Sequence, residues 1–174
     1  MTFTLCTLCT PAPDDAADFE RVRQLSWRAA YTGVFAEKLF AEREELLHTR
    51  AQSFSEWFAG LDSDGFDTET GTGARRRARI AKNEESEVIG TASTRQVSGE
   101  ILELESFYLH PEVFGTGVGE ALMRDVLPDG EPATLEVLAA NPRAIAFYKK
   151  HGFTETGKTS KFAGHKTLVM GRNL

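Results

Sequence analysis

Residues 104–123 read Leu-Glu-Ser-Phe-Tyr-Leu-His-Pro-Glu-Val-Phe-Gly-Thr-Gly-Val-Gly-Glu-Ala-Leu-Met. An apolar strand is predicted to run to Leu109, and the His-Pro pair that follows breaks it. Gly115, Gly117 and Gly119 then open an amphipathic helix, so the backbone can turn tightly and approach a ligand closely. Because the first N–H groups of a helix lack partners and its dipole favours anions, this turn predicts phosphate or pyrophosphate binding.

Two other phosphate-binding motifs are excluded, one by the spacing of these glycines and the other by the residue that follows them. A dinucleotide fingerprint requires G-x-G-x-x-G, whereas this chain has G-x-G-x-G. A nucleotide-hydrolase phosphate loop requires a lysine after its last glycine, where this chain has Glu120. Taken alone, the motif also fits a tight turn that binds no ligand.

A second motif follows at residues 135–153, Leu-Glu-Val-Leu-Ala-Ala-Asn-Pro-Arg-Ala-Ile-Ala-Phe-Tyr-Lys-Lys-His-Gly-Phe. A short strand is predicted to end near Ala139, and a helix follows with Pro142 in its first turn and Gly152 as its stop. One face of this helix carries an amide that can cap it, a small residue and two aromatics: Asn141, Ala144, Phe147 and Tyr148.

Together the two motifs resemble those of the GNAT superfamily, the acetyl-CoA-dependent N-acetyltransferases, over roughly residues 88–153. The stretch Ser-Trp-Arg-Ala-Ala-Tyr-Thr-Gly at 26–33 is similar to the branch that includes phosphinothricin-type acetyltransferases. The resemblance implies a GNAT fold, acetyl-CoA as co-substrate and one acetyltransferase domain over residues 1–174.

The order of the predicted elements indicates a mixed α/β domain of α+β type. Its single central sheet is mostly antiparallel, with about seven strands and about four flanking helices. The first strand is expected at residues 2–9, a helical region at about 36–59 and a flexible acidic loop at 62–74. The last two strands are expected near 153–162 and 166–172.

Composition narrows the classes of function. Lysine plus arginine is 20 and aspartate plus glutamate is 26, so the net charge of the 174 residues is −6. An acidic chain is a poor non-specific binder of nucleic acid or anionic membranes, and neither partner is expected. No apolar run could cross a bilayer and no secretory signal is visible, so a cytoplasmic protein is predicted.

No metal site is predicted. Cys6 and Cys9 form a lone C-x-x-C, whereas a structural zinc site needs four ligands. The acidic loop does not meet the spacing of a calcium loop, because Phe66 occupies a ligand position.

Acetyl transfer to an amine needs a base, a polarised carbonyl and an acid for the leaving thiolate. Glu103 and Glu105 are the candidate bases, on the strand before the glycine turn. Two residues apart, they point to the same face of a regular strand, and a β-bulge would separate them. The resemblance favours Glu103 by position, and the alternative is that one or both carboxylates face solvent.

Tyr148 is the candidate acid. A phenol with a pKa near 10 suits proton delivery to a thiolate, and the resemblance places this tyrosine beside the sulfur of CoA. The alternative is a packing aromatic next to Phe147. The resemblance also implies that a backbone N–H near Leu109 holds the thioester carbonyl.

The cofactor-binding residues implied are Tyr108, Leu109, Phe114, Gly115, Thr116, Gly117, Val118, Gly119, Asn141, Ala144, Phe147 and Tyr148. Phe114 departs from the family pattern, which begins with Arg or Gln. An aromatic ring cannot donate a hydrogen bond to the pyrophosphate as those side chains can. Glu120 adds an unfavourable charge if it points inward.

The predicted function is transfer of an acetyl group from acetyl-CoA to the primary amine of a small molecule, in a ternary complex. Trp27 and Tyr31, four apart on one helical face, are the candidate acceptor-binding residues. The alternatives are a protein or peptide N-acetyltransferase and a degenerate acyl-CoA-binding module without turnover. A homodimer is compatible with the resemblance, although no residue argues for one.

Overall fold

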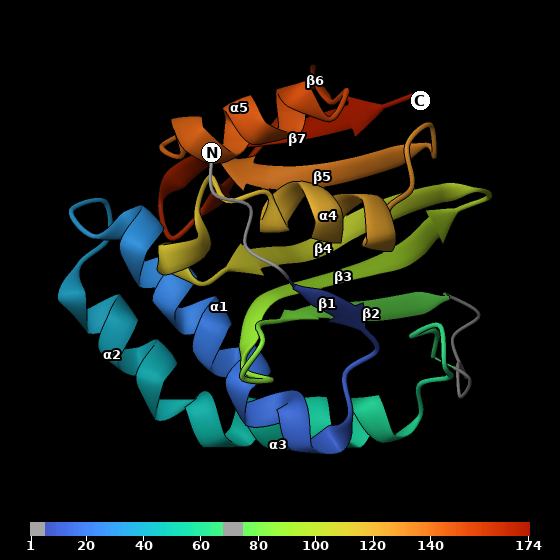
Figure 1. Ribbon diagram of the computed structural model, residues 1–174. Helices are drawn as coiled ribbons and strands as arrows, with labels where there is room; N and C mark the ends of the chain where they lie inside the picture. Colours follow the sequence, from blue (N-terminus) through green and yellow to red (C-terminus); the bar gives the residue numbers. More distant parts are fainter. Residues whose placement is uncertain (1–5, 68–74) are drawn as a thin grey trace.

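A seven-stranded sheet organises the computed structural model, which describes residues 6–67 and 75–174 (Figure 1). The strands are β1 (Thr7–Cys9), β2 (Arg76–Lys82), β3 (Val88–Ser98), β4 (Ile101–Leu109), β5 (Ala133–Leu138), β6 (Thr154–Phe162) and β7 (His165–Arg172). Their order across the sheet is β1-β2-β3-β4-β5-β7-β6, and every neighbouring pair except β4 and β5 is antiparallel. The predicted mixed α/β architecture is confirmed. Residues 2–5 of the expected first strand and 68–74 of the expected loop lie outside the described residues.

In the described part of the chain five helices accompany the sheet, where about four were predicted. They are α1 (Ala16–Tyr31), α2 (Glu37–Glu45), α3 (Leu47–Ala59), α4 (Val118–Val126) and α5 (Pro142–Lys150), with short 3₁₀ turns at Pro13–Asp15 and Pro111–Val113. The helical region predicted for 36–59 is confirmed, but it consists of two helices, α2 and α3, that are separated at Leu46. The Leu46 N–H bonds to the carbonyls of Arg43 and Glu44, so the regular helical pattern stops without any glycine or proline to signal it.

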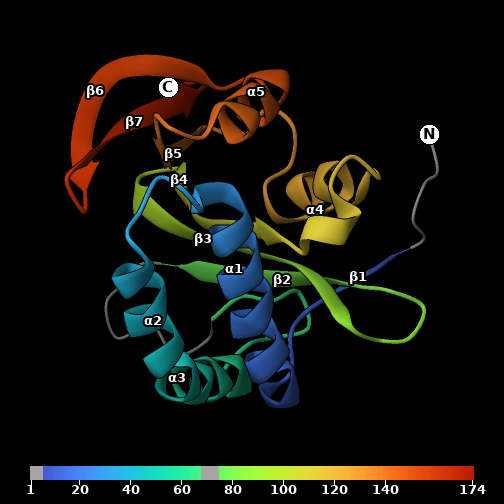
Figure 2. The ribbon, with the colours of Figure 1, turned by 90° about the vertical axis from the view of Figure 1, so that its left-hand side faces the viewer.

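The helices cover both faces of the sheet. Figure 2 shows α4 on the opposite side of the sheet from α1 and α3. On one side, Phe19 of α1 and Phe58 of α3 pack with Ile80 of β2. On the other, Leu122 and Met123 of α4 pack with residues of β3, β4 and β5. None of the described helices is long and apolar enough to span a membrane.

Strands β4 and β5 diverge, and this divergence creates room for a site. Their parallel pairing joins only Leu102 to Ala133 and Glu103 to Thr134. Beyond these pairs β4 stays bonded to β3, while β5 stays bonded to β7 as far as Leu138. The two strands therefore line a gap in the middle of the sheet.

Candidate active site

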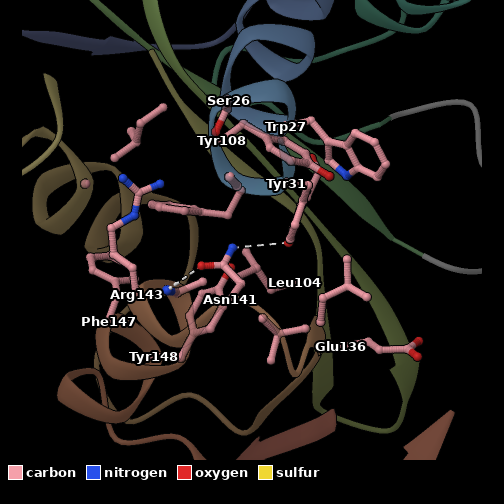
Figure 3. Close-up of a pocket in the computed structure, with 18 of the residues that line it drawn as sticks. Ser26, Trp27, Tyr31, Leu104, Tyr108, Glu136, Asn141, Arg143, Phe147 and Tyr148 are labelled. Carbon is pink, nitrogen blue, oxygen red and sulfur yellow. Dashed lines mark hydrogen bonds between the residues drawn. The ribbon is translucent and has the colours of Figure 1, made fainter. Parts of the chain in front are cut away.

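A pocket of about 600 Å³ occupies this gap. Residues 104–109 of β4 and 136–138 of β5 line it, together with parts of α1, α5, the glycine turn and the β6–β7 hairpin. In Figure 3, Arg143 and Glu136 lie at opposite ends of the labelled residues, with Asn141 and Tyr31 between them. Arg143 and Glu120 are thus the charged lining residues near the glycine turn, whereas Glu136 of β5 and Lys161 of β6 belong to other parts of the lining.

The glycine turn has two structural requirements. Gly115 and Gly117 have φ values of +77° and +93°, in the left-handed region that favours glycine. A Cβ atom on Gly119 would lie 3.0 Å from the Leu109 side chain and 3.4 Å from the Phe147 ring. The first two glycines therefore allow the turn, and the third lets α4 begin close against β4 and α5.

Part of the predicted cofactor set lines the pocket and part does not. The residues that line it are Tyr108, Leu109, Phe114, Gly115, Gly119, Asn141, Ala144, Phe147 and Tyr148. Thr116, Gly117 and Val118 are not among the lining residues. The Thr116 hydroxyl donates to the Val113 carbonyl at 2.8 Å, and Val118 is buried in the core, so both side chains serve the turn itself.

Asn141 joins α5 to α1. Its Oδ1 accepts a hydrogen bond from the Ala144 N–H at 3.0 Å, which caps α5 as predicted. Its Nδ2 donates to the Tyr31 hydroxyl at 3.1 Å (Figure 3). One amide therefore fixes the relative position of two pocket walls that are 110 residues apart in the chain.

The two candidate bases are treated differently by the structure. Ser106 pairs with Ser93 and Leu104 with Thr94, so Glu105 is the extra residue of a β-bulge. Glu105 lines the pocket and contacts Arg76 at 3.2 Å and Arg95 at 3.6 Å. Glu103 is not a lining residue and forms an ion pair with Arg95 at 2.6 Å. Geometry therefore favours Glu105, whereas the sequence resemblance favoured Glu103.

Tyr148 lies on the wall formed by α5. Burial raises the pKa of its phenol well above the ordinary value, and the nearby Tyr108 and Tyr31 raise this pKa further. The side chain therefore keeps its proton throughout the neutral and moderately alkaline range. A protonated phenol inside a pocket can donate to a developing anion.

Aromatic side chains dominate the wall farthest from the glycine turn. Trp27 and Tyr31 are 5% and 8% exposed and both line the pocket. Trp27 stacks on Phe35, with ring centroids 4.9 Å apart and planes 7° apart. Phe162 of β6 meets Trp27 edge-on at 6.0 Å, and 43% of Phe162 remains exposed. The β6–β7 hairpin thus reaches back to α1.

A buried polar network of α1 and α2 side chains contacts the ring system of Trp27. The fully buried Glu20 accepts hydrogen bonds from Arg23 at 3.0 Å and from Gln24 at 2.5 Å. Gln24 in turn accepts from Arg43 at 3.1 Å, and the Arg43 guanidinium lies 4.2 Å from the centre of the Trp27 ring system. The network links α1 to α2 and limits the positions open to the indole.

Sequence reasoning missed three lining residues of interest, namely Glu136, Arg143 and Phe162. Glu136 lies on β5 and accepts a hydrogen bond from the Thr167 hydroxyl. Arg143 follows the capping Asn141 by two residues, which was the available signal that it belongs near the site. No local pattern marks Phe162, because its place depends on how the hairpin folds back.

Within residues 6–67 and 75–174, no group of three or more His, Cys, Asp or Glu side chains is arranged to hold a metal ion. The pocket therefore offers backbone donors, Arg143, carboxylates and a phenol as its chemical groups. Backbone donors and Arg143 suit an anionic ligand, and the carboxylates suit a cationic one.

Comparison with known proteins identifies the family of this chain. The sequence model described as the acetyltransferase (GNAT) family matches residues 19–153. The peptidyl-lysine N-acetyltransferase YjaB of Escherichia coli (strain K12) is 32% identical over 80 residues, which cover 46% of this chain and 51% of that protein. The match therefore spans about half the length of this relative. The uncharacterized N-acetyltransferase Rv2669 of Mycobacterium tuberculosis (strain ATCC 25618 / H37Rv) is 33% identical over 107 residues, or 57% of this chain and 69% of that protein.

Two solved structures share the fold. The crystal structure of PaiA N-acetyltransferase from Thermoplasma acidophilum in complex with coenzyme A has a TM-score of 0.71 at 19% identity, covering 98% of this chain and 99% of that one. The solution structure of apo-form YjaB from Escherichia coli has a TM-score of 0.64 at 20% identity, covering 97% and 98%. At these identities the likeness concerns the fold.

Proposed function

The chain belongs to the acetyltransferase (GNAT) family, and on that basis we propose that it moves an acetyl group from acetyl-CoA to the primary amine of a small molecule. One observation carries the proposal. A single pocket is lined by the glycine turn and Arg143, by the phenol of Tyr148, and by the carboxylates of Glu105 and Glu136. This set provides for an anionic donor, a proton acceptor, a proton donor and a cationic acceptor.

The described residues fit a CoA thioester, which supplies the acetyl group when bound. The first turn of α4 offers backbone N–H groups that lack helical acceptors, beside the positive φ glycines. Asn141 retains a second lone pair on Oδ1 and a second hydrogen on Nδ2 after its two protein contacts, so it can also bind amide groups of a ligand. Ala144 leaves space beside it on the same face of α5.

We assign the proton transfers to Glu105 and Tyr148. Glu105 accepts a proton from the acceptor ammonium, directly or through one water. The free amine nitrogen then bonds to the acetyl carbonyl carbon as the carbon–sulfur bond breaks. Tyr148 donates a proton to the leaving thiolate, and the surplus proton on the new amide nitrogen passes through solvent to the Tyr148 phenolate and restores the phenol. A backbone N–H near Leu109 is the candidate donor to the carbonyl oxygen. Glu103 is the other candidate base, and the substitution Glu103→Gln tests it.

A small acceptor is favoured by the way in which the pocket is covered. Phe162 of the β6–β7 hairpin contacts Trp27 of α1, so two distant elements meet across the acceptor wall. A peptidyl lysine is the second candidate, since YjaB is named a peptidyl-lysine N-acetyltransferase and matches part of this chain. In either case, Glu136 and Glu105 would attract the positive charge of the acceptor.

The test measures release of free CoA thiol from acetyl-CoA with a panel of acceptors. The panel contains small monoamines, small diamines, free amino acids and a lysine peptide with blocked ends. Fast release with a small amine and a slow background without one is the expected result. Release only with the peptide would replace the small-molecule acceptor, and CoA binding without release from any acceptor would favour a binding module.

A further inference from the structure

Phe114 and Arg143 form a contact between the glycine turn and α5. Phe114 begins the glycine turn but has no side-chain donor. The Arg143 guanidinium carbon lies 3.6 Å from the centroid of the Phe114 ring, within cation–π range. Both residues line the pocket. We propose that Arg143, stacked on the Phe114 ring, supplies the cationic contact to the pyrophosphate of CoA; this inference rests on the proposed function.

Arg143 has no competing partner in the described part of the chain. Arg76, Arg79 and Arg95 each form an ion pair with a carboxylate. By contrast, neither a hydrogen bond nor an ion pair joins Arg143 to any of the described residues. Stacking occupies the face of the guanidinium and leaves its N–H edges available. Those edges match two oxygens of a phosphate group, which a lysine ammonium cannot do as well.

The carboxylate of Glu120, near the glycine turn, is paired with a lysine of α5, the helix that also carries Arg143. Glu120, in the first turn of α4, pairs with Lys150 at 2.9 Å. Lys150 and Arg143 lie seven residues apart, about two turns along α5, so both belong to one side of that helix. Helix α5 therefore offsets the negative charge of Glu120 and adds a free cation beside the backbone donors of α4.

The position of the contact favours the pyrophosphate over the other phosphate of CoA. Arg143 is anchored to the residue that immediately precedes Gly115, and the N–H groups of the turn and of the first α4 residues follow directly. A phosphate bound to those N–H groups lies where the guanidinium edges can reach it. The adenosine 3′-phosphate is separated from the pyrophosphate by a ribose and need not approach this turn.

The experiment compares CoA with dephospho-CoA, which retains the pyrophosphate and lacks the 3′-phosphate. Isothermal titration calorimetry gives the Kd of each compound for the wild type, Arg143→Gln and Arg124→Gln. Arg124 is the matched control, because it is an exposed arginine of α4 that pairs with Asp129. Arg143→Gln is expected to raise the Kd of both compounds about tenfold, and Arg124→Gln to leave both unchanged.

The outcomes separate this inference from the proposed function. If the Kd values of Arg143→Gln equal those of the wild type, the inference is overturned although CoA still binds. If Arg143→Gln weakens the binding of CoA but not of dephospho-CoA, the inference is also overturned, because Arg143 would then contact the 3′-phosphate. A wild type that binds neither compound defeats the proposed function itself. Phe114→Leu tests whether stacking on the Phe114 ring positions Arg143. About threefold weaker binding of both compounds is expected, and unchanged Kd values would show that Phe114 does not position Arg143 for the pyrophosphate.

Discussion

The two ends of the pocket are built in different ways. The proposed cofactor end, comprising Gly115, Gly119, Arg143 and Phe147, comes from two short motifs, each of which turns a strand into a helix. The proposed acceptor end, comprising Trp27, Glu136 and Phe162, comes from three separate elements, α1, β5 and β6. Local turns can present backbone donors to an anion, whereas an aromatic wall requires distant elements to meet.

This difference predicts how substitutions will behave. Changes at the cofactor end should alter CoA affinity, and changes at the acceptor end should alter acceptor affinity. Changes where the two ends meet, at Glu105, Asn141 and Tyr148, should alter turnover or stability. The following variants test that division, from the largest expected effect to the smallest.

Glu105→Gln is expected to lower kcat/KM about 100-fold at neutral pH, because it removes the pocket-lining carboxylate that we propose as the base. Glu103→Gln is the matched control on the same strand and should lower kcat/KM less than about threefold. Steady-state kinetics of both variants make the comparison. If Glu103→Gln shows the larger loss, the base is Glu103 and the lining of the pocket does not identify it.

Tyr148→Phe is expected to lower kcat about tenfold with little change in the Kd of acetyl-CoA. Since burial raises the pKa of this phenol, its protonated form persists to higher pH than that of a free tyrosine. The pH profile of the wild type should therefore show no loss of activity from tyrosine ionisation up to about pH 10. Equal kcat in the variant would reduce Tyr148 to a packing residue.

Asn141→Ala is expected to lower the free energy of unfolding by about 1 kcal/mol, because the cap of α5 is lost. The Tyr31 contact disappears as well, so the two walls become less firmly joined. Asn141→Asp keeps the cap and loses the amide donor, and chemical denaturation of both variants separates the two roles. If Asn141→Ala is as stable as the wild type, neither the cap nor the contact with Tyr31 stabilises the fold.

Phe162→Ala is expected to raise the KM of the acceptor about threefold, because part of the aromatic wall is lost. Calorimetric titration should show the same Kd for CoA as in the wild type. Leu174→Ala is a suitable control, since it removes an exposed apolar side chain elsewhere. A changed Kd for CoA with an unchanged acceptor KM would mean that the two ends are not divided as described.

Lys150→Gln should have the smallest effect, a few tenths of a kcal/mol in unfolding free energy, because the Lys150 side chain is largely exposed where it pairs with Glu120. The hydrogen bond from Lys150 lowers the pKa of Glu120 in the folded protein. The stabilisation is therefore present above the ordinary carboxyl pKa and is lost as pH falls through the lowered folded value. Urea unfolding of wild type and variant at neutral and acidic pH should show the difference shrinking, and a constant difference would contradict this account.

Several features could be predicted from sequence because their causes are local. Positive φ at Gly115 and Gly117 and the cap at Asn141 follow from residue type and neighbours. The strand and helix order around residues 88–153 follows from apolar periodicity, and the observed bounds agree with it. The break at Leu46 escaped prediction because no residue there is a helix breaker.

The sequence by itself determined the family, the glycine turn and the capped helix, since these depend on conformational preferences of adjacent residues. Only the tertiary structure decided which carboxylate lines the pocket, because the bulge at Glu105 depends on how β4 pairs with β3. It likewise placed Arg143 on Phe114 and Phe162 on Trp27. Contacts of this kind depend on the packing of whole elements, for which neighbouring residues in the chain provide no signal.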